Sequence, residues 1–196
     1  MSHRKFSNNR YEEIKKEVLI MFQDAEYDSF PIDCFEIAKR LRYVIRRYSE
    51  LEPDALIESL AISKDGYSRV EPDPNTGMYR YVIYYNDWTP NRGRQRWTIF
   101  HEIGHICLGH HDNPSGNEKT EDDEADFFAK YAMDPPPLVH AKHCQNPDDV
   151  CYVFSTSGEF SVYAFEYYRK WLYDGPPNLS VTELEILRQF HFDTAA

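Results

Sequence analysis

Cysteine is scarce in this sequence and basic residues are outnumbered, and each shortage excludes a class of protein. The chain of 196 residues has four cysteines and no Cys-x-x-Cys pair, so we expect free thiols and neither a disulfide framework nor a cysteine zinc site. The 22 lysines and arginines against 33 acidic residues give a net charge of −11. A domain that grips nucleic-acid phosphates has the opposite sign, so we expect no direct nucleic-acid partner.

Long apolar runs are also absent. No stretch approaches the roughly 18 apolar residues that a membrane-spanning helix needs, and the first residues lack the apolar core of an export signal. We therefore expect a cytoplasmic protein with no membrane partner. Hydrophobic residues at 41% and charged residues at 28% are typical of a globular domain.

The order of the expected elements indicates the fold class. Apolar residues recur with a helical period near residues 8–25, 33–41, 95–108, 120–133, 147–154, 160–171 and 180–190. Strands are expected at 43–48 and 78–85, loops at 65–77 and 88–93, a helix break at the prolines of 134–137, and a linker at 175–177. Ser180 and Glu183 match a capping box. Helices, then a small sheet, then helices predict an α+β fold.

The segment His101-Glu102-Ile103-Gly104-His105 carries the clearest chemistry in the chain. On a helix both histidines face one side, and an apolar back of isoleucines and Phe100 faces the other. Histidines four residues apart can reach one metal ion, and Glu102 then lies beside the metal and suits the role of a base for water. We predict His101 and His105 as zinc ligands and Glu102 as the catalytic base.

A catalytic zinc site needs a third protein ligand, for which three residues compete. His111 has the spacing of a third histidine but lacks the glycine three residues after the second histidine. Glu121 is placed to favour a helix N-terminus. Glu124 lies in the middle of the apolar stripe of its helix, where a carboxylate is costly without a partner. A buried pair with an arginine would also explain Glu124, but we predict it as the third zinc ligand.

Two blocks of the sequence resemble the ImmA/IrrE family of metallopeptidases. The first is residues 95–106, which is similar to the family's Arg-Phe-Thr-x-x-His-Glu-x-Gly-His core. The second begins at Glu124 and ends at Pro135, and it is similar to the family's Glu-Ala-Asn/Asp-x-Phe-Ala-x-x-Leu-Met-Pro block. With the opening at Pro31-Ile32-Asp33, the likeness extends over residues 30–137.

This resemblance implies a bacterial, phage or mobile-element protein with a zincin-like fold, in which helices pack on a small, mostly antiparallel sheet. It also implies a Zn²⁺ cofactor, and Glu124 at the position of the family's zinc-binding glutamate. The implied partner is a co-encoded helix-turn-helix transcriptional repressor, which such proteins cleave or bind. We expect residues 1–137 to form the metallopeptidase domain and residues 138–196 to form a C-terminal helical extension.

The predicted function is that of a zinc-dependent endopeptidase, with the strand at 78–85 as the sheet edge that receives an extended peptide. The alternative is a non-proteolytic module that binds a repressor or an antitoxin and holds a structural zinc ion. The presence of Glu102 argues against this module, because a closed structural site needs no base. A DNA-binding regulator that uses the C-terminal helices is disfavoured by the acidic charge.

Overall fold

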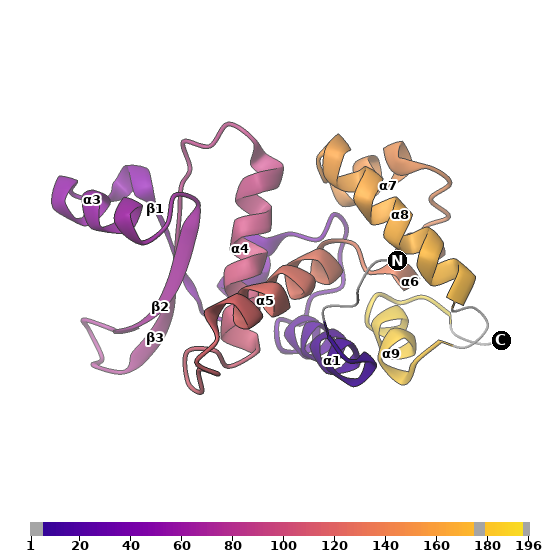
Figure 1. Ribbon diagram of the computed structural model, residues 1–196, viewed down its shortest axis with the longest axis horizontal. Coiled ribbons are helices and arrows are strands. Elements are labelled where there is room, and N and C mark those ends of the chain that lie inside the picture. The colour runs from indigo at the N-terminus through magenta and orange to yellow at the C-terminus, as the bar shows by residue number, and fades with distance from the viewer. Residues whose placement is uncertain (1–5, 175–178, 194–196) are drawn as a thin grey trace. The chain divides into compact units, whose positions relative to one another are not determined.

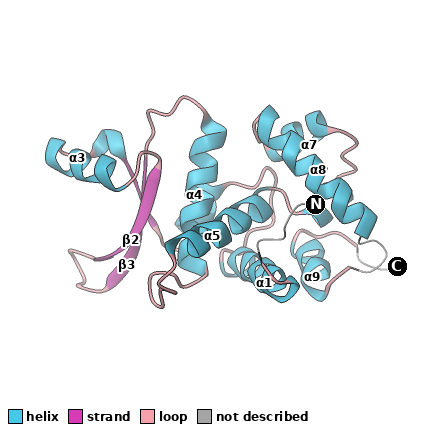
Figure 2. Cartoon of the chain, in the orientation of Figure 1, coloured by secondary structure: helices cyan, strands magenta, loops and turns pink. Residues whose placement is uncertain are grey.

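The structure, a computed structural model, describes residues 6–174 and 179–193, which hold many helices and one small sheet (Figure 2). In chain order the elements are α1 (Asn8–Asp24), α2 (Cys34–Arg40), β1 (Val44–Arg47), η1 (Tyr48–Glu50), α3 (Pro53–Ile62), β2 (Gly66–Pro72), β3 (Tyr79–Tyr85), α4 (Arg92–Cys107), α5 (Glu118–Met133), α6 (Pro136–Ala141), α7 (Pro147–Phe154), α8 (Gly158–Asp174) and α9 (Val181–Gln189). The predicted α+β class is confirmed. The predicted linker at 175–177 lies outside the described residues.

The chain divides into two compact units. One unit is residues 34–129, and the other combines residues 1–33 with residues 130–196. This grouping places the first and last parts of the chain in one unit. From the sequence we expected a division at residue 137 instead, and that division stays a prediction.

The sheet belongs to the unit of residues 34–129 and has the strand order β1-β3-β2. Strand β1 pairs in parallel with β3, with Val44 opposite Val82, and β2 pairs antiparallel with β3, with Gly66 opposite Tyr85. The strand predicted at residues 78–85 is confirmed as β3. Its predicted place at the edge is wrong, because β3 lies between the other two strands; its last four residues are buried, as in a central strand.

Strand β2 occupies part of the stretch predicted as a loop, and Gly66 shows why. A Cβ atom at residue 66 would lie 2.5 Å from the carbonyl oxygen of Tyr84 and 2.6 Å from Cγ2 of Thr98. The glycine therefore marks the place where β2 meets its neighbouring strand and helix α4, and not a turn. Pro72 ends β2, which is an outer strand of this sheet, and a proline is tolerated on such a strand.

Helix α4 runs alongside the sheet and contacts both β2 and β3 (Figure 1). Its first turn is capped by the side chain of Asn91, which accepts a hydrogen bond from the backbone N–H of Arg94. Its apolar side is fully buried at Ile99, Phe100 and Ile103. The buried side fixes the rotation of the helix, so the residues opposite it have a defined direction.

The second unit is helical in its described residues. Helix α1 packs on α9, α7 packs on α8, and α6 contacts both α8 and α9. The predicted capping box of the last helix is confirmed, because both of its hydrogen bonds between Ser180 and Glu183 are present. The predicted break at 134–137 is confirmed as well, since α5 ends at Met133 and α6 begins at Pro136.

Candidate metal centre

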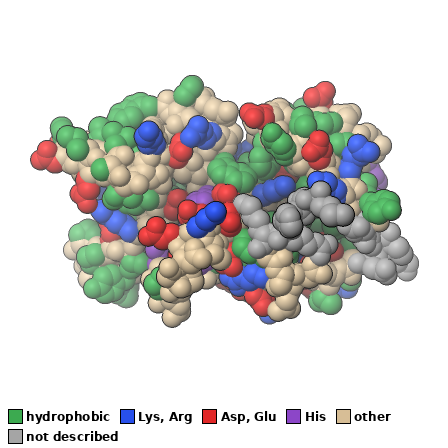
Figure 3. Space-filling model, viewed as in Figure 1, with side chains coloured by type: hydrophobic (Ala, Val, Ile, Leu, Met, Phe, Trp, Pro, Cys, Tyr) green, Lys and Arg blue, Asp and Glu red, His purple; other side chains and the backbone are tan. Residues whose placement is uncertain are grey.

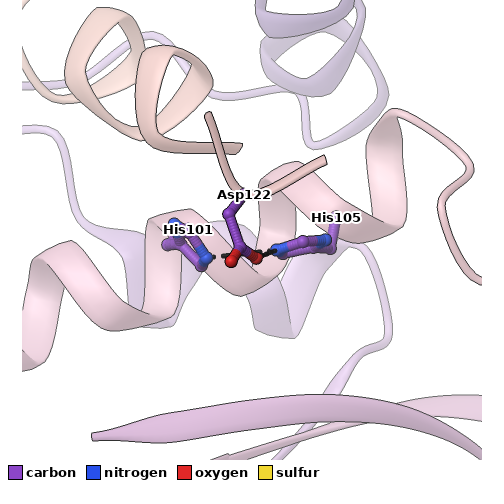
Figure 4. Close-up of side chains that lie close together, drawn as sticks. All are labelled: His101, His105 and Asp122. Carbon is purple, nitrogen blue, oxygen red and sulfur yellow. Dashed lines mark hydrogen bonds and ion pairs between the residues drawn. The ribbon is translucent and has the colours of Figure 1, made fainter. Parts of the chain in front are cut away.

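Helix α4 presents His101 and His105 on the side opposite its buried back, because residues four apart lie one turn apart on a helix. Their Nε2 atoms are 3.1 Å from each other, so both imidazoles point at the same place (Figure 4). Both side chains are largely buried, with 19% and 15% of their surface exposed. The structure therefore brings the two predicted histidine ligands together.

Asp122 on helix α5 reaches the same place from the other side. Its Oδ1 atom lies 3.5 Å from Nε2 of His105, and Figure 4 shows its carboxylate between the two imidazoles. One ligand atom from each of His101, His105 and Asp122 lies within 4.8 Å of the others. The side chain of Asp122 is 65% exposed. Figure 3 shows acidic side chains grouped beside a histidine on the face that it draws.

Two of the distances among these three groups match those around a zinc ion. Zinc bonds to nitrogen and oxygen of about 2.0–2.2 Å in a tetrahedron hold the ligand atoms about 3.3 Å apart. The observed 3.1 Å between the histidine nitrogens and 3.5 Å between His105 and Asp122 lie on either side of that value. Two imidazoles and one carboxylate are also a ligand set of catalytic zinc sites, which leave a fourth position open.

The surroundings of the two histidines act on their protonation in opposite directions. Nδ1 of His101 lies 3.0 Å from Oδ1 of Asp126. A carboxylate only accepts hydrogen bonds, so Nδ1 donates and a metal would bind through Nε2. Burial lowers the pKa of His101, but this hydrogen bond and the neighbouring carboxylates outweigh burial and raise it. Burial, together with the neighbouring His101, lowers the pKa of His105 to about 3, so this imidazole is neutral at physiological pH.

Glu102 is buried beside the three clustered groups and is held from the sheet. The hydroxyl of Ser68 on β2 donates to Oε2 of Glu102 at 2.7 Å, and its oxygen lies 2.9 Å from Nε2 of His111. Because the serine has one hydroxyl proton, His111 donates to Ser68 from Nε2. Burial raises the pKa of Glu102, which suits a group that takes up and returns a proton near neutral pH.

The other three candidates for the third ligand each contact a different group. Oε2 of Glu124 is 3.3 Å from Nε2 of His110, and His110 in turn contacts His105. Glu121 accepts a hydrogen bond from the backbone of the loop before α5, and His111 contacts the sheet as described above. The ligand role of Glu124 stays a prediction, and the geometry favours Asp122 for that role.

Comparison with known families identifies the segment that holds this centre. Residues 54–149 match the family model of Peptidase_M78, described as the IrrE N-terminal-like domain. These residues are an IrrE N-terminal-like domain. The resemblance to the ImmA/IrrE family is thereby confirmed, and the domain includes β2, β3, α4 and the whole of α5. No curated protein sequence matches the chain.

The IrrE N-terminal-like domain belongs to a peptidase family, which supports a metallopeptidase relationship for this chain. All residues of the candidate metal centre lie inside the matched segment. Among the described residues, no helix has the length and apolar character needed to cross a membrane.

Proposed function

We propose that the chain is a zinc-dependent endopeptidase whose metal ligands are His101, His105 and Asp122. The observation that carries this proposal is the meeting of these three groups at zinc-like spacing, on the helix that also bears Glu102. The peptidase family match supports the same chemistry. Asp122 replaces Glu124 as the proposed ligand because its carboxylate lies with the two imidazoles.

The proposed mechanism is hydrolysis with Glu102 as general base and general acid. A bound zinc ion would supply Lewis acidity to the peptide carbonyl and to water. Glu102 takes a proton from the attacking water and passes it to the nitrogen of the leaving amine. The hydrogen bond from Ser68 restricts the rotation of the Glu102 carboxylate, so that the base is oriented before substrate arrives.

The proposed substrate is an extended segment of a protein that pairs with β2. In the described part of the chain β2 has β3 as its sheet neighbour, which leaves its other edge available for a peptide strand. Ser68 lies on β2 and contacts Glu102, so a peptide on that edge would run close to the base. The family resemblance points to a co-encoded helix-turn-helix repressor as the substrate.

The test compares the unmodified chain with Glu102→Gln, each loaded with zinc and incubated with peptides from a denatured bacterial proteome. Glutamine has nearly the same shape but cannot take up the proton. We expect unchanged zinc content and a loss of about 10²–10⁴-fold in the rate of new N-termini detected by mass spectrometry. Glu118→Gln, an exposed residue at the start of α5, serves as the charge-matched control and keeps full activity.

Two outcomes would reject the proposal. Full cleavage by Glu102→Gln would remove the base from the mechanism. Stoichiometric zinc without cleavage by the unmodified chain, either of these peptides or of a co-encoded repressor, would instead support the non-proteolytic binding module.

A further inference from the structure

Strand β2 points the backbone of every second residue away from β3, toward what we call its free edge. The N–H of Asn86 donates to the carbonyl of Asp65 at 2.8 Å, just before β2 begins. The N–H of Asp73 donates to the carbonyl of Met78 at 2.7 Å, just after β2 ends. Both bonds continue the register of the antiparallel pair, in which bonded and outward-facing residues alternate. The odd-numbered residues of β2 therefore bond to β3, and the even-numbered residues face the free edge.

Three of the four outward-facing residues offer no N–H to a further strand. The N–H of Gly66 donates to a serine hydroxyl of the preceding loop at 3.2 Å. The N–H of Ser68 donates to the carboxylate of Glu102. Pro72 has no N–H at all. Within β2, Val70 therefore carries the outward N–H that remains for a partner.

The side chain of Val70 lies on the sheet face that carries the candidate metal centre. Residues two apart on a strand share a face, and the hydroxyl of Ser68 on this face contacts Glu102 at 2.7 Å. Val70 is opposite Tyr81 of β3, and its side chain is 40% exposed. An apolar side chain on an unpaired edge favours the addition of another strand. A strand on this edge would pass Val70 about 7 Å from Ser68.

We propose that Val70 is a specificity-determining residue, which binds the substrate backbone through its N–H and C=O and selects an apolar side chain opposite it. The inference rests on the endopeptidase function proposed above. Directly paired residues carry their side chains on one face of a sheet, about 5 Å apart, so the substrate side chain opposite Val70 lies against it. The distance from Ser68 places this substrate residue within about two positions of the cleaved bond.

The first test weakens the backbone contact from the side of the substrate. Copies of one peptide that the zinc-loaded chain cleaves carry a single thioamide, a poorer hydrogen-bond acceptor, at successive positions other than the cleaved bond. We expect one position, within about two residues of that bond, to raise KM about 3–10-fold with kcat little changed. Val70→Pro removes the outward N–H and leaves the ladder to β3 intact, as Pro72 does, so in this variant the penalty should disappear.

The second test changes the side chain and reads the sequences that are cut. Among peptides from a denatured bacterial proteome, the unmodified chain should favour apolar residues at one position within about two residues of the cleaved bond. Val70→Lys should shift the preference at that position toward Asp and Glu by about tenfold, because the new charge attracts carboxylates and rejects apolar side chains. Val162→Lys on α8, where the valine is 44% exposed, is the matched control and should keep the original profile.

The outcomes separate this inference from the function on which it rests. Cleavage with an unchanged sequence profile in Val70→Lys would overturn the role of the side chain. Cleavage with no sensitive position in the thioamide series would overturn the backbone contact, and the endopeptidase function would stand in both cases. Absence of cleavage by the unmodified chain would reject the proposed function, and this inference with it.

Discussion

Replacement of Gly104 by alanine tests how closely α4 and α5 approach, since this approach brings Asp122 to the two histidines. A Cβ atom at residue 104 would lie 3.1 Å from Cδ1 and 3.2 Å from Cβ of Phe128. Carbon atoms pack best about 3.5–4.0 Å apart. Phe128 is fully buried and cannot move into solvent, so α5 must shift away from α4 to make room.

The magnitude follows from two opposing effects. Overpacking a core costs about 1–3 kcal/mol, whereas alanine in place of glycine inside a helix gains about 1 kcal/mol. We expect Gly104→Ala to lower the free energy of unfolding in urea by about 1 kcal/mol. The Kd for zinc should weaken as well, because the same shift draws Asp122 on α5 away from the histidines on α4.

Two controls isolate the contact. Gly158, the first residue of α8, has open space around its Cβ position, so Gly158→Ala should not destabilise the chain. In a Phe128→Ala background, which removes Cγ and Cδ1 but keeps Cβ, Gly104→Ala should lose part of its penalty, which a double-mutant cycle would report as coupling of about 0.5 kcal/mol. A Gly104→Ala chain more stable than the unmodified chain, with unchanged zinc affinity, would refute the close approach of the two helices.

Three further predictions concern stability and reactivity. Gly66→Ala should destabilise the chain by about 3 kcal/mol in urea unfolding, because the added carbon meets the backbone oxygen of Tyr84, which cannot rotate away; a change near zero would show that the strand can move. Glu183→Ala should cost about 1–2 kcal/mol, since it removes one half of the α9 capping box and one of the two carboxylates beside the largely buried Lys15, which keeps Glu12 at 2.7 Å; a neutral result would show that neither contact stabilises the chain. Burial raises the pKa of the Cys144 thiol to about 11, so below that pH the thiol stays protonated. Iodoacetamide should therefore label Cys144 at neutral pH only when urea unfolds the chain. Fast labelling of Cys144 in the native chain would contradict its burial.

Elements with local signals could be predicted from the sequence alone. The period of apolar residues predicted α4 with its buried side at Ile99 and Ile103, and the capping box predicted the start of α9 at Ser180 and Glu183. These signals depend on residues within one or two turns of each other. No knowledge of the rest of the fold was needed to read them.

Strand β2 was not predicted, because the composition of its segment is typical of a loop. Two glycines, two prolines and Asn75 made residues 65–77 resemble a loop. Gly66 is present because the strand and α4 leave no room for a side chain there, which only the folded arrangement shows. Ser68 lies on the same strand, so its contact with Glu102 was missed together with the strand.

The third ligand shows the limit of reasoning from one helix. Glu124 was predicted as the third zinc ligand, and that role stays a prediction; the structure shows Glu124 buried, with His110 as a neighbour. Asp122 is exposed and sits on the polar side of α5, so nothing on that helix alone distinguishes it. The sequence did offer one signal, because Asp122 and Asp126 are four residues apart and therefore share a helix face. In the structure these two residues contact the two histidines of α4.

An anomalous difference map at the zinc absorption edge, from crystals of the zinc-loaded chain, would locate the metal directly. We expect one peak bonded to Nε2 of His101, Nε2 of His105 and a carboxylate oxygen of Asp122, with Glu102 outside the first coordination sphere. A peak bonded to Glu124 in place of Asp122, or no peak at these histidines, would contradict this expectation.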